Sequence, residues 1–481
     1  MNLTLLTDLY ELTMMQGYFK NHTRQTVVFD MFYRENPCNG GYAITAGLDQ
    51  VIKYIKELHF SSEDIAYLKS LNIFEQDFLD YLKGFFFSGD IYAIPEGTVV
   101  FPREPLLKVI APIMEAQLIE TAILNIINHQ SLIATKASRV VHAARGDGVM
   151  EFGLRRAQGP DAGIYGARAA VIGGCVGTSN VLAGQLFDIP VKGTHAHSWI
   201  MSFPDEYTAF KTYARLYPNA CTLLVDTYDT LKTGVPNAIR VFTEMREDGI
   251  SLKNYGIRLD SGDLAYLSKE AYKMLAAAGF EDAVISASSD LDENLIASLK
   301  SQRAKINSWG VGTNLITSNG HPAFGGVYKL AAIKNEGEDE FVPKIKLSET
   351  TEKVTNPGNK TVYRIYNKSN GKIQADLICL IGEVFDETQD MIIFDPIDTW
   401  KKTKIRGGTY FMRELLIPVF EKGECVYTSP SVMEIRQFCI QELNTLWDEK
   451  KRLVNPSEVY VDLSDKLYHL KGKLLEEMGS V

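Results

Sequence analysis

The feature that most constrains the fold is a repeated pattern in the middle of the chain, from Gly193 onward. Short apolar runs end in small or polar residues, and stretches with helical spacing follow; such runs are CTLLVDTYDT, YGIRLDSGD, AVISASSD and INSWGVGTN. The pattern recurs at roughly 25–35 residues, the length of one βα unit. It predicts a parallel (β/α) barrel or a related sheet, in which the chemistry lies at the carboxyl ends of the strands.

The regions on either side of this pattern predict a different, mixed α/β structure. Before it we expect a helix at 3–19, a strand at 27–35, helices at 44–59 and 62–83, short strands within 88–112 and a long helix at 113–135. After it we expect β-hairpins within 347–382 and helices at 430–452 and 462–478. The expected domains are therefore an N-terminal α/β domain (1–130), a barrel-like catalytic domain (131–345) and a C-terminal region (346–481) that returns to the outer domain.

Composition limits the class of protein. The 481 residues are 45% hydrophobic, enough for a large core in more than one domain. A net charge of −10 argues against nucleic-acid or anionic-membrane partners. Six scattered cysteines without a CxxC pair, and an N-terminus that carries Asp8 and Glu11 where a signal peptide would be basic, indicate a cytoplasmic protein.

The segment RLDSGDL places Asp260 and Asp263 at the end of a predicted strand. Two neighbouring carboxylates can hold Mg²⁺ or accept hydrogen bonds from ribose hydroxyls. Arg258 lies two residues before Asp260 and shares its face of the strand. The alternative is that the DSGD sequence simply caps the following helix.

Two glycine-containing segments follow later predicted strands. GVGT contains Gly310, Gly312 and Thr313, and GGVYKL contains Gly325 and Gly326. Glycine allows the backbone to approach a phosphate closely, and the N–H groups at a helix start supply donors. Together the segments favour a phosphate-binding site, although either one alone is also typical of an ordinary loop.

KGTHAHSW contains two histidines two residues apart, so in a strand both side chains would point to one face. His195 and His197 in this arrangement could bind zinc in a barrel hydrolase, could be core or capping residues, or could supply a base or phosphoryl acceptor. EFGLRR places Phe152 beside Arg155, a combination that suits a flat, anionic aromatic substrate but is equally typical of a core aromatic beside solvent-exposed arginines.

These motifs, together with TDLYELTMMQGY and FGLRRAQGPDAG, occur in the order seen in nicotinate phosphoribosyltransferases, and the resemblance covers essentially the whole chain. It implies a (β/α) barrel-like type II phosphoribosyltransferase domain with an outer α/β domain built from both chain ends. It also implies a homodimer with shared active sites, substrates nicotinate, phosphoribosyl pyrophosphate (PRPP) and ATP, and Mg²⁺ held through the substrate pyrophosphate without a dedicated protein site.

The resemblance further implies individual residue roles. His197 matches the histidine phosphorylated by ATP, and Asp260 and Asp263 match residues that hold the ribose and the Mg²⁺–pyrophosphate. Nicotinate is expected to contact Tyr10 of the partner subunit together with Phe152, Arg155, Ser179, Thr194 and Arg258. PRPP phosphates are expected at Arg139, Gly310, Gly312, Thr313, Gly325 and Gly326. His195 receives no role.

One position favours nicotinate over nicotinamide. Relatives that use nicotinamide carry an Asp in a GTDT stretch, where this chain has GTSN and therefore Ser179. A carboxylate there would repel the acid by several kcal/mol at ~4 Å and intermediate dielectric, whereas a hydroxyl would not. Nicotinamide phosphoribosyl transfer, a metal-dependent barrel hydrolase using His195 and His197, and a non-catalytic nucleotide-binding regulator remain as alternatives.

Overall fold

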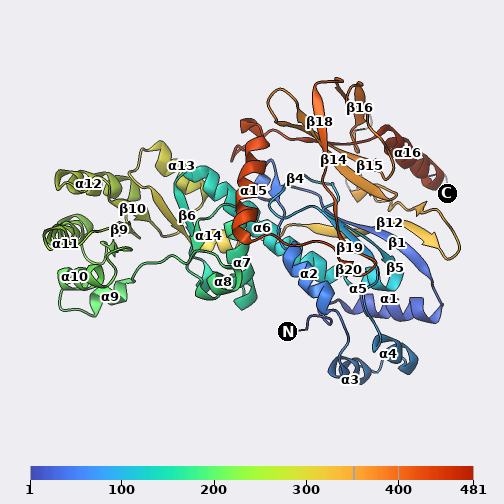
Figure 1. Ribbon diagram of the computed structural model, residues 1–481, viewed down its shortest axis with the longest axis horizontal. Coiled ribbons are helices and arrows are strands. Elements are labelled where there is room, and N and C mark those ends of the chain that lie inside the picture. The colour runs from blue at the N-terminus through green and yellow to red at the C-terminus, as the bar shows by residue number, and fades with distance from the viewer. Residues whose placement is uncertain (1, 350–352, 399, 480–481) are drawn as a thin grey trace. The chain divides into compact units, whose positions relative to one another are not determined.

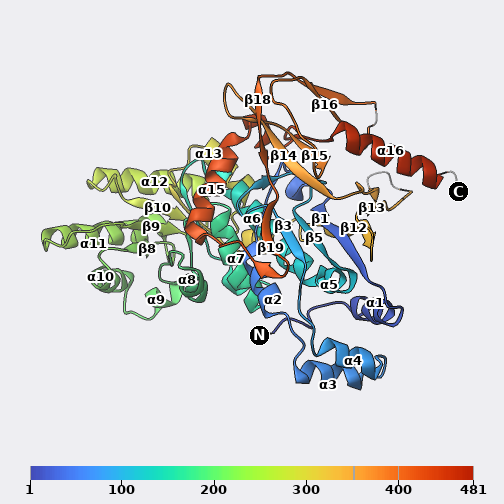
Figure 2. The same cartoon turned by 45° about the vertical axis from the view of Figure 1, so that its right-hand side comes forward.

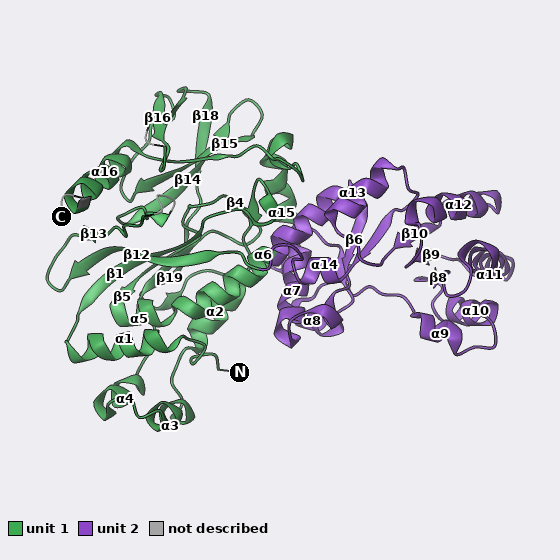
Figure 3. Ribbon diagram, turned by 180° about the vertical axis from the view of Figure 1, so that it is seen from behind, with its two compact units in different colours: residues 1–132, 323–430, 437–481 green, residues 133–322, 431–436 purple. Residues whose placement is uncertain are grey.

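The computed structural model describes residues 2–349, 353–398 and 400–479, and the chain forms two compact units (Figure 3). The first unit contains residues 1–132, 323–430 and 437–481, so it is built from both ends of the chain. The second contains residues 133–322 and 431–436. Within the described residues, no helix combines the length and the apolar character needed to cross a membrane.

The second unit contains a six-stranded, all-parallel sheet in the order β7-β6-β11-β10-β9-β8. Figure 1 labels β6, β9 and β10 among these strands. The strands are β6 (Gly148–Glu151), β7 (Gly177–Thr178), β8 (Thr222–Leu224), β9 (Gly256–Leu259), β10 (Val284–Ala287) and β11 (Ser308–Val311). Around the sheet the strands follow one another in chain order, β6, β7, β8, β9, β10 and β11, and β11 pairs with β6. The ring is open between β7 and β8, which are the two edge strands. The predicted barrel-like fold is confirmed as an incomplete barrel.

Helices between the strands surround this sheet, as Figure 2 shows for α10, α11 and α12 beside β8, β9 and β10. They are α7 (Pro160–Ile172), α8 (Val181–Phe187), α9 (His197–Met201), α10 (Glu206–Leu216), α11 (Val235–Glu247), α12 (Leu264–Ala277), α13 (Glu293–Ser301) and α14 (Thr313–Ile316). The strands are apolar on both faces because helices cover the sheet: Leu223 and Leu224 are both fully buried. Polar side chains therefore gather near the strand ends, with Ser286 inside β10 as an exception.

The first unit contains a seven-stranded sheet (β13-β12-β1-β5-β3-β19-β20), a six-stranded sheet (β17-β16-β21-β15-β14-β18) and the pair β2-β4. The strands are β1 (Gln25–Tyr33), β2 (Ala43–Ile44), β3 (Asp90–Ala93), β4 (Val99–Val100), β5 (Leu107–Pro112), β12 (Gly326–Asn335), β13 (Val342–Pro343), β14 (Lys360–Asn367), β15 (Ile373–Leu380), β16 (Met391–Phe394), β17 (Lys402–Ile405), β18 (Tyr410–Glu414), β19 (Ile417–Glu421), β20 (Glu424–Cys425) and β21 (Tyr460–Leu463). β1 pairs antiparallel with β5 on one side and β12 on the other.

The pairing of β12 with β1 explains where the two units divide. Residues 323–345 belong to the first unit, because β12 completes its larger sheet from Gly326 opposite Tyr33 to Asn335 opposite Gln25. The domain boundary expected from the sequence lies further along, at residue 345. The three-part domain division remains a prediction, while the return of the C-terminal region to the outer α/β part is confirmed.

The helices outside the barrel differ in their bounds from those expected, and two of them, at Glu120–Ala144 and Val432–Thr445, also contribute residues to the second unit. They are α1 (Leu9–Lys20), α2 (Leu48–Glu57), α3 (Ser62–Ser70), α4 (Gln76–Leu82), α5 (Ile113–Leu118), α6 (Glu120–Ala144), α15 (Val432–Thr445) and α16 (Asp465–Gly479). The stretch expected as helix at 62–83 is broken after α3, because Asn72 adopts a left-handed conformation with φ 55°. The hairpin near residue 370 is confirmed as β14–β15, and residues 350–352 of the expected hairpin region lie outside the described residues.

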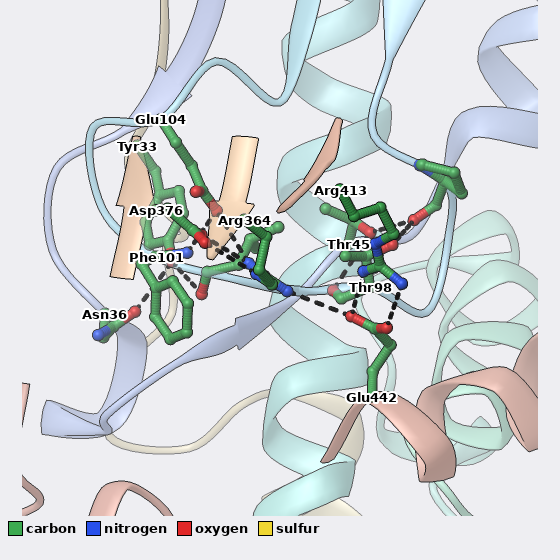
Figure 4. Close-up of polar contacts among 12 residues, drawn as sticks. Tyr33, Asn36, Thr45, Thr98, Phe101, Glu104, Arg364, Asp376, Arg413 and Glu442 are labelled. Carbon is green, nitrogen blue, oxygen red and sulfur yellow. Dashed lines mark hydrogen bonds and ion pairs between the residues drawn. The ribbon is translucent and has the colours of Figure 1, made fainter. Parts of the chain in front are cut away.

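A buried ionic network ties this hairpin to its surroundings (Figure 4). Arg364 on β14 is fully buried and binds Asp376 on β15 through two parallel hydrogen bonds, Nε–Oδ1 at 2.9 Å and Nη2–Oδ2 at 2.7 Å. Its Nη1 also donates to Glu442 Oε2 on α15 at 3.2 Å. Burial and the charge of Asp376 hold the pKa of Glu104 well above its usual value. One guanidinium thus fixes β14, β15 and α15 together.

Candidate active site

The strand ends of the second unit surround a cavity of about 490 Å³. Residues from the loops after β6, β7, β9, β10 and β11, and from the segment that leads into α9, line it. They are Phe152, Arg155, Arg156, Ser179, Gly193, Thr194, His195, Ala196, His197, Arg258, Asp260, Ser288, Ser289, Asp290, Gly310, Gly312 and Thr313. Most residues that the sequence selected for a site therefore lie around one space, at the end of the sheet where barrel chemistry is expected.

One wall of the cavity is the ring of Phe152. Phe152 follows β6, and its N–H donates to the carbonyl of Val311 on β11 at 2.8 Å, which fixes the backbone beside the neighbouring strand. Gly310 lies directly against the ring: a Cβ on Gly310 would be 2.6 Å from Phe152 Cδ2. The glycine is therefore required at this position by the close approach of the aromatic ring, in addition to any contact with a phosphate.

Arg258 is the principal cation of the lining, and three neighbours hold it. Its Nη1 donates to the Thr194 hydroxyl, and its Nε donates to Ser288 Oγ at 3.0 Å. Ser288 Oγ in turn donates to Asp260 Oδ1, which also lies 3.4 Å from Arg258 Nη2. The side chains of β9 and β10 thus form one network that presents a guanidinium and a carboxylate side by side.

Asp226 is the residue that the sequence analysis missed. Its side chain is 2% exposed at the end of β8, and its Oδ1 lies 3.3 Å from His197 Nε2. Its Oδ2 accepts hydrogen bonds from the Asp260 N–H at 2.8 Å and the Ser261 hydroxyl at 2.7 Å. Asp226 therefore links the histidine to the Asp260 loop. In CTLLVDTYDT this Asp follows the last apolar residue of the strand, just as Asp260 does in YGIRLDSGD, so the signal was present.

The expectation that His195 and His197 share one face of a strand is wrong. Residues 192–196 form a loop, and His197 begins α9. His195 is 8% exposed; its Nε2 accepts the Leu224 N–H at 3.3 Å, and its ring packs edge-on against Tyr213. Burial lowers the pKa of His195 to about 4, so the ring is neutral. No group of three or more His, Cys, Asp and Glu side chains able to hold a metal occurs among the described residues.

Ser179 lies at the end of β7, where its N–H donates to the carbonyl of Glu151 at 3.0 Å. The Glu151 side chain is fully buried beneath the loop, and it accepts hydrogen bonds from the Gly153 N–H and from Thr178 Oγ1. Burial raises the pKa of Glu151. These contacts fix the strand end so that the Ser179 side chain lines the cavity.

Other predicted site residues lie elsewhere. Asp263 caps α12, where its Oδ1 accepts the Tyr266 N–H at 3.0 Å, as the helix-capping alternative predicts. Arg139 is buried in α6, and its Nε donates to Glu293 at 3.2 Å. The described lining of the cavity includes neither residue. Tyr10, Gly325 and Gly326 belong to the first unit, on α1 and at the start of β12.

Comparison with solved structures and known families places this fold among the phosphoribosyltransferases. The structure is similar to that of human nicotinic acid phosphoribosyltransferase, with a TM-score of 0.82 and 29% identity over 97% of this chain and 99% of that chain. It also resembles nicotinate-nucleotide pyrophosphorylase from Pyrococcus furiosus in fold, with a TM-score of 0.69 and 23% identity over 92% of this chain and 96% of that chain.

Sequence comparison identifies the family. Residues 5–128 match the nicotinate phosphoribosyltransferase N-terminal domain, residues 148–370 the nicotinate phosphoribosyltransferase family and residues 359–471 the C-terminal domain. Nicotinate phosphoribosyltransferase of Bacillus subtilis is 46% identical, over 100% of this chain and 96% of its own length. One from Mycobacterium tuberculosis is 40% identical over 96% and 92%. The chain belongs to the nicotinate phosphoribosyltransferase family.

Proposed function

We propose that the protein joins nicotinate to the phosphoribosyl group of PRPP, in the first step of NAD salvage from nicotinate, with one ATP hydrolysed in each cycle. The products are nicotinate mononucleotide, pyrophosphate, ADP and phosphate. The observation that carries the proposal is that Phe152, Arg258, Asp260 and His197 line one cavity. An aromatic face, a cation, a carboxylate and a nucleophilic ring are the groups that this reaction requires.

The nicotinate ring stacks on Phe152, and its carboxylate binds the guanidinium of Arg258. Arg155 and Thr194 also line the cavity and complete this anion site. Ser179 offers a neutral hydroxyl to the substrate. A carboxylate at that position would face the nicotinate carboxylate, so the hydroxyl favours the acid over nicotinamide.

In the transfer step the bond from C1′ to the pyrophosphate oxygen breaks, and the pyridine nitrogen forms the new bond to C1′. Asp260 accepts hydrogen bonds from the ribose hydroxyls and stabilises positive charge that develops at C1′. The backbone at Gly310, Gly312 and Thr313 approaches the 5′-phosphate. A carboxylate oxygen of Asp260 would be a ligand of the kind that Mg²⁺ prefers, and the ion would be held mainly by the substrate pyrophosphate, whose charge it would neutralise.

His197 accepts the γ-phosphoryl group of ATP, and water later removes it as phosphate. The contact between Asp226 and Nε2 places the ring proton on that nitrogen, which leaves the lone pair of Nδ1 free to attack phosphorus. Because Asp226 also binds the Asp260 N–H, a change at His197 reaches the loop that binds ribose. This connection is our physical reason for coupling ATP hydrolysis to PRPP binding.

The active form is a cytoplasmic homodimer in which Tyr10 of one subunit covers the nicotinate ring bound by its partner. The first turns of α1 support this, because Leu9 and Tyr10 expose 54% and 45% of their surface although both are apolar or aromatic. Candidate phosphate ligands remain at Gly325 and Gly326, and a candidate ribose ligand at the cap residue Asp263. Arg139 remains a candidate for PRPP binding, and it would act indirectly, through its contact with Glu293.

The experiment that tests the function is mass-spectrometric detection of product from purified protein and PRPP. Nicotinate and nicotinamide are compared, each with and without ATP. We expect nicotinate mononucleotide as the product, more of it with ATP, and little conversion of nicotinamide. Equal conversion of nicotinate and nicotinamide would show that Ser179 does not select the acid. No product from either substrate would refute the proposal.

The variant His197→Ala tests the ATP step. It should abolish ATP stimulation and ADP release while retaining a low rate of transfer without ATP. His195→Ala serves as a comparison for loss of an imidazole from the same segment; its stability should fall, but ATP stimulation should persist in the folded fraction. ATP stimulation that survived in His197→Ala would show that this residue is not the phosphoryl acceptor.

A further inference from the structure

We propose that the six-stranded sheet of the first unit carries a second small-molecule site, which binds a nucleoside phosphate. The site is a cavity of about 510 Å³, within the range of roughly 300–1,000 Å³ typical of small-molecule pockets. It lies among the starts of β15 and β21, the strand β17 and the segment that follows α15.

The sheet that carries this cavity is curled. β17 and β18 are at opposite edges of the sheet order, yet only residues 406–409 join them. A flat sheet of this width would separate its edge strands by about 24 Å at ~4.8 Å a strand, whereas this connection reaches at most about 18 Å. The edges must therefore approach each other. Apolar side chains such as Ile365, Leu377 and Ile405 fill the interior, and the cavity lies at one end.

Two aromatic side chains line the cavity, Trp447 and Tyr460. The Trp447 indole Nε1 donates to the Ile373 carbonyl at 2.9 Å, which fixes the orientation of the indole. Tyr460 begins β21 and leaves 57% of its surface exposed. Aromatic side chains stack on nucleobases with a gain of about 1–3 kcal/mol for each base, so this wall suits a planar heterocycle.

The lining also carries three cations, Lys404, Arg406 and Lys450, against one carboxylate, Glu449. Lys404 pairs with Asp390 at 2.7 Å, but both side chains are largely exposed, so the pair is weak and open to exchange. Lys450 is oriented by hydrogen bonds to Ser457 Oγ and the Glu458 carbonyl. The excess of positive charge favours a phosphate group, and Glu449 can accept hydrogen bonds from ribose hydroxyls.

An aromatic wall, a cationic rim and one acceptor match the three parts of a nucleoside phosphate: base, phosphate and ribose. A free inorganic anion would leave the aromatic wall unused, and an apolar ligand would make no use of the positive charge at the rim. This cavity shares no lining residue with the cavity at the barrel strand ends, which belongs to the second unit. The inference therefore stands independently of the proposed transfer reaction.

The test is photolabelling of the whole protein with 8-azido-AMP, followed by peptide mapping, because mapping separates this site from the active site. We expect label in the peptides that contain Trp447 or Tyr460, and protection by AMP. Adenosine and inorganic pyrophosphate should each protect at least tenfold less well than AMP. The K404E/R406E variant should require at least tenfold more reagent for the same labelling, with transfer activity unchanged.

Two further variants test whether labelling depends on this cavity. K466E/K473E removes two exposed lysines of α16 outside the cavity and should label like the parent protein. Tyr460→Ser removes one aromatic without touching the Trp447 hydrogen bond and should weaken labelling. The proposal is overturned if label appears only in peptides from residues 152–313, if K404E/R406E and K466E/K473E label alike, or if pyrophosphate protects as well as AMP.

Discussion

Gly310→Ala tests the packing that shapes the proposed nicotinate slot. The new methyl group would lie 2.6 Å from Phe152 Cδ2 and 2.7 Å from Cε2, whereas carbon atoms in contact prefer about 3.5–4.0 Å. Gly310 lies in β11, which is held between β6 and β10, so its backbone has little freedom to move. The ring of Phe152 must therefore retreat by about 1 Å.

A displacement of about 1 Å in a substrate-positioning group can cost roughly 100-fold in rate, which corresponds to ~2.7 kcal/mol of transition-state stabilisation. We expect a fall of this size in kcat/KM for nicotinate. Overpacking of a buried site costs ~1–3 kcal/mol in stability, so the thermal midpoint should drop by a few degrees without loss of the fold. The assay is steady-state kinetics at saturating PRPP, together with thermal unfolding of each variant.

Phe152→Ala supplies the matched control, because it removes the atoms that the methyl group would strike. The next neighbour, Ser288 Cβ, is 3.6 Å from the new methyl, an ordinary contact. In the Phe152→Ala background, Gly310→Ala should lower kcat/KM by less than about threefold, giving a coupling energy of roughly 2 kcal/mol between the two sites. A full 100-fold loss in both backgrounds would refute the reasoning and would point to the contact between backbone and phosphate instead.

Three other substitutions probe separate features. Asp226→Asn keeps the shape of the side chain but removes its charge from His197, so the ATP-stimulated rate should fall about 100-fold; steady-state kinetics with and without ATP measures this, and an unchanged ratio would contradict it. Ser179→Asp should lower kcat/KM for nicotinate by at least tenfold through charge repulsion, whereas the neutral Ser179→Asn should change it far less; equal effects would exclude repulsion as the cause. Arg364→Met leaves its carboxylate partners buried without their cation, so urea unfolding should show a loss of ~3–5 kcal/mol; a loss under about 1 kcal/mol would mean that the network is not a stabilising element.

The barrel part of the fold was accessible from sequence because parallel strands buried on both faces are short apolar runs, with polar residues only where the strand ends. Arg258 and Asp260 were identified for this reason, and they indeed line one cavity with Phe152. The same rule should have selected Asp226. No second charged residue two positions earlier marks that strand end, as Arg258 marks that of Asp260.

What the sequence could not supply was the local backbone conformation. DSGD is compatible with two converging carboxylates or with a helix cap, and only the turn through Gly262, at φ 79°, decides that Asp263 faces the start of α12. HAH is compatible with a strand, in which both rings align, or with a loop that leads into a helix, as here, where His195 packs against Tyr213 and His197 contacts Asp226. The aromatic wall of Trp447 and Tyr460 had no sequence signal, because Trp447 reaches the start of β15 from the segment after α15, and Tyr460 comes from β21, which pairs with β15.

The central place of β1 in its sheet has a consequence for biosynthesis. One partner of β1 is β12, and residues 34–325 must leave the ribosome before β12 follows. At ~5–20 residues per second this takes about 15–60 s, during which one side of β1 has unpaired backbone groups. Exposed strand edges recruit other chains. Nascent protein should therefore need chaperone protection in this interval, and slowing translation between residues 34 and 325 should lower the yield of folded enzyme.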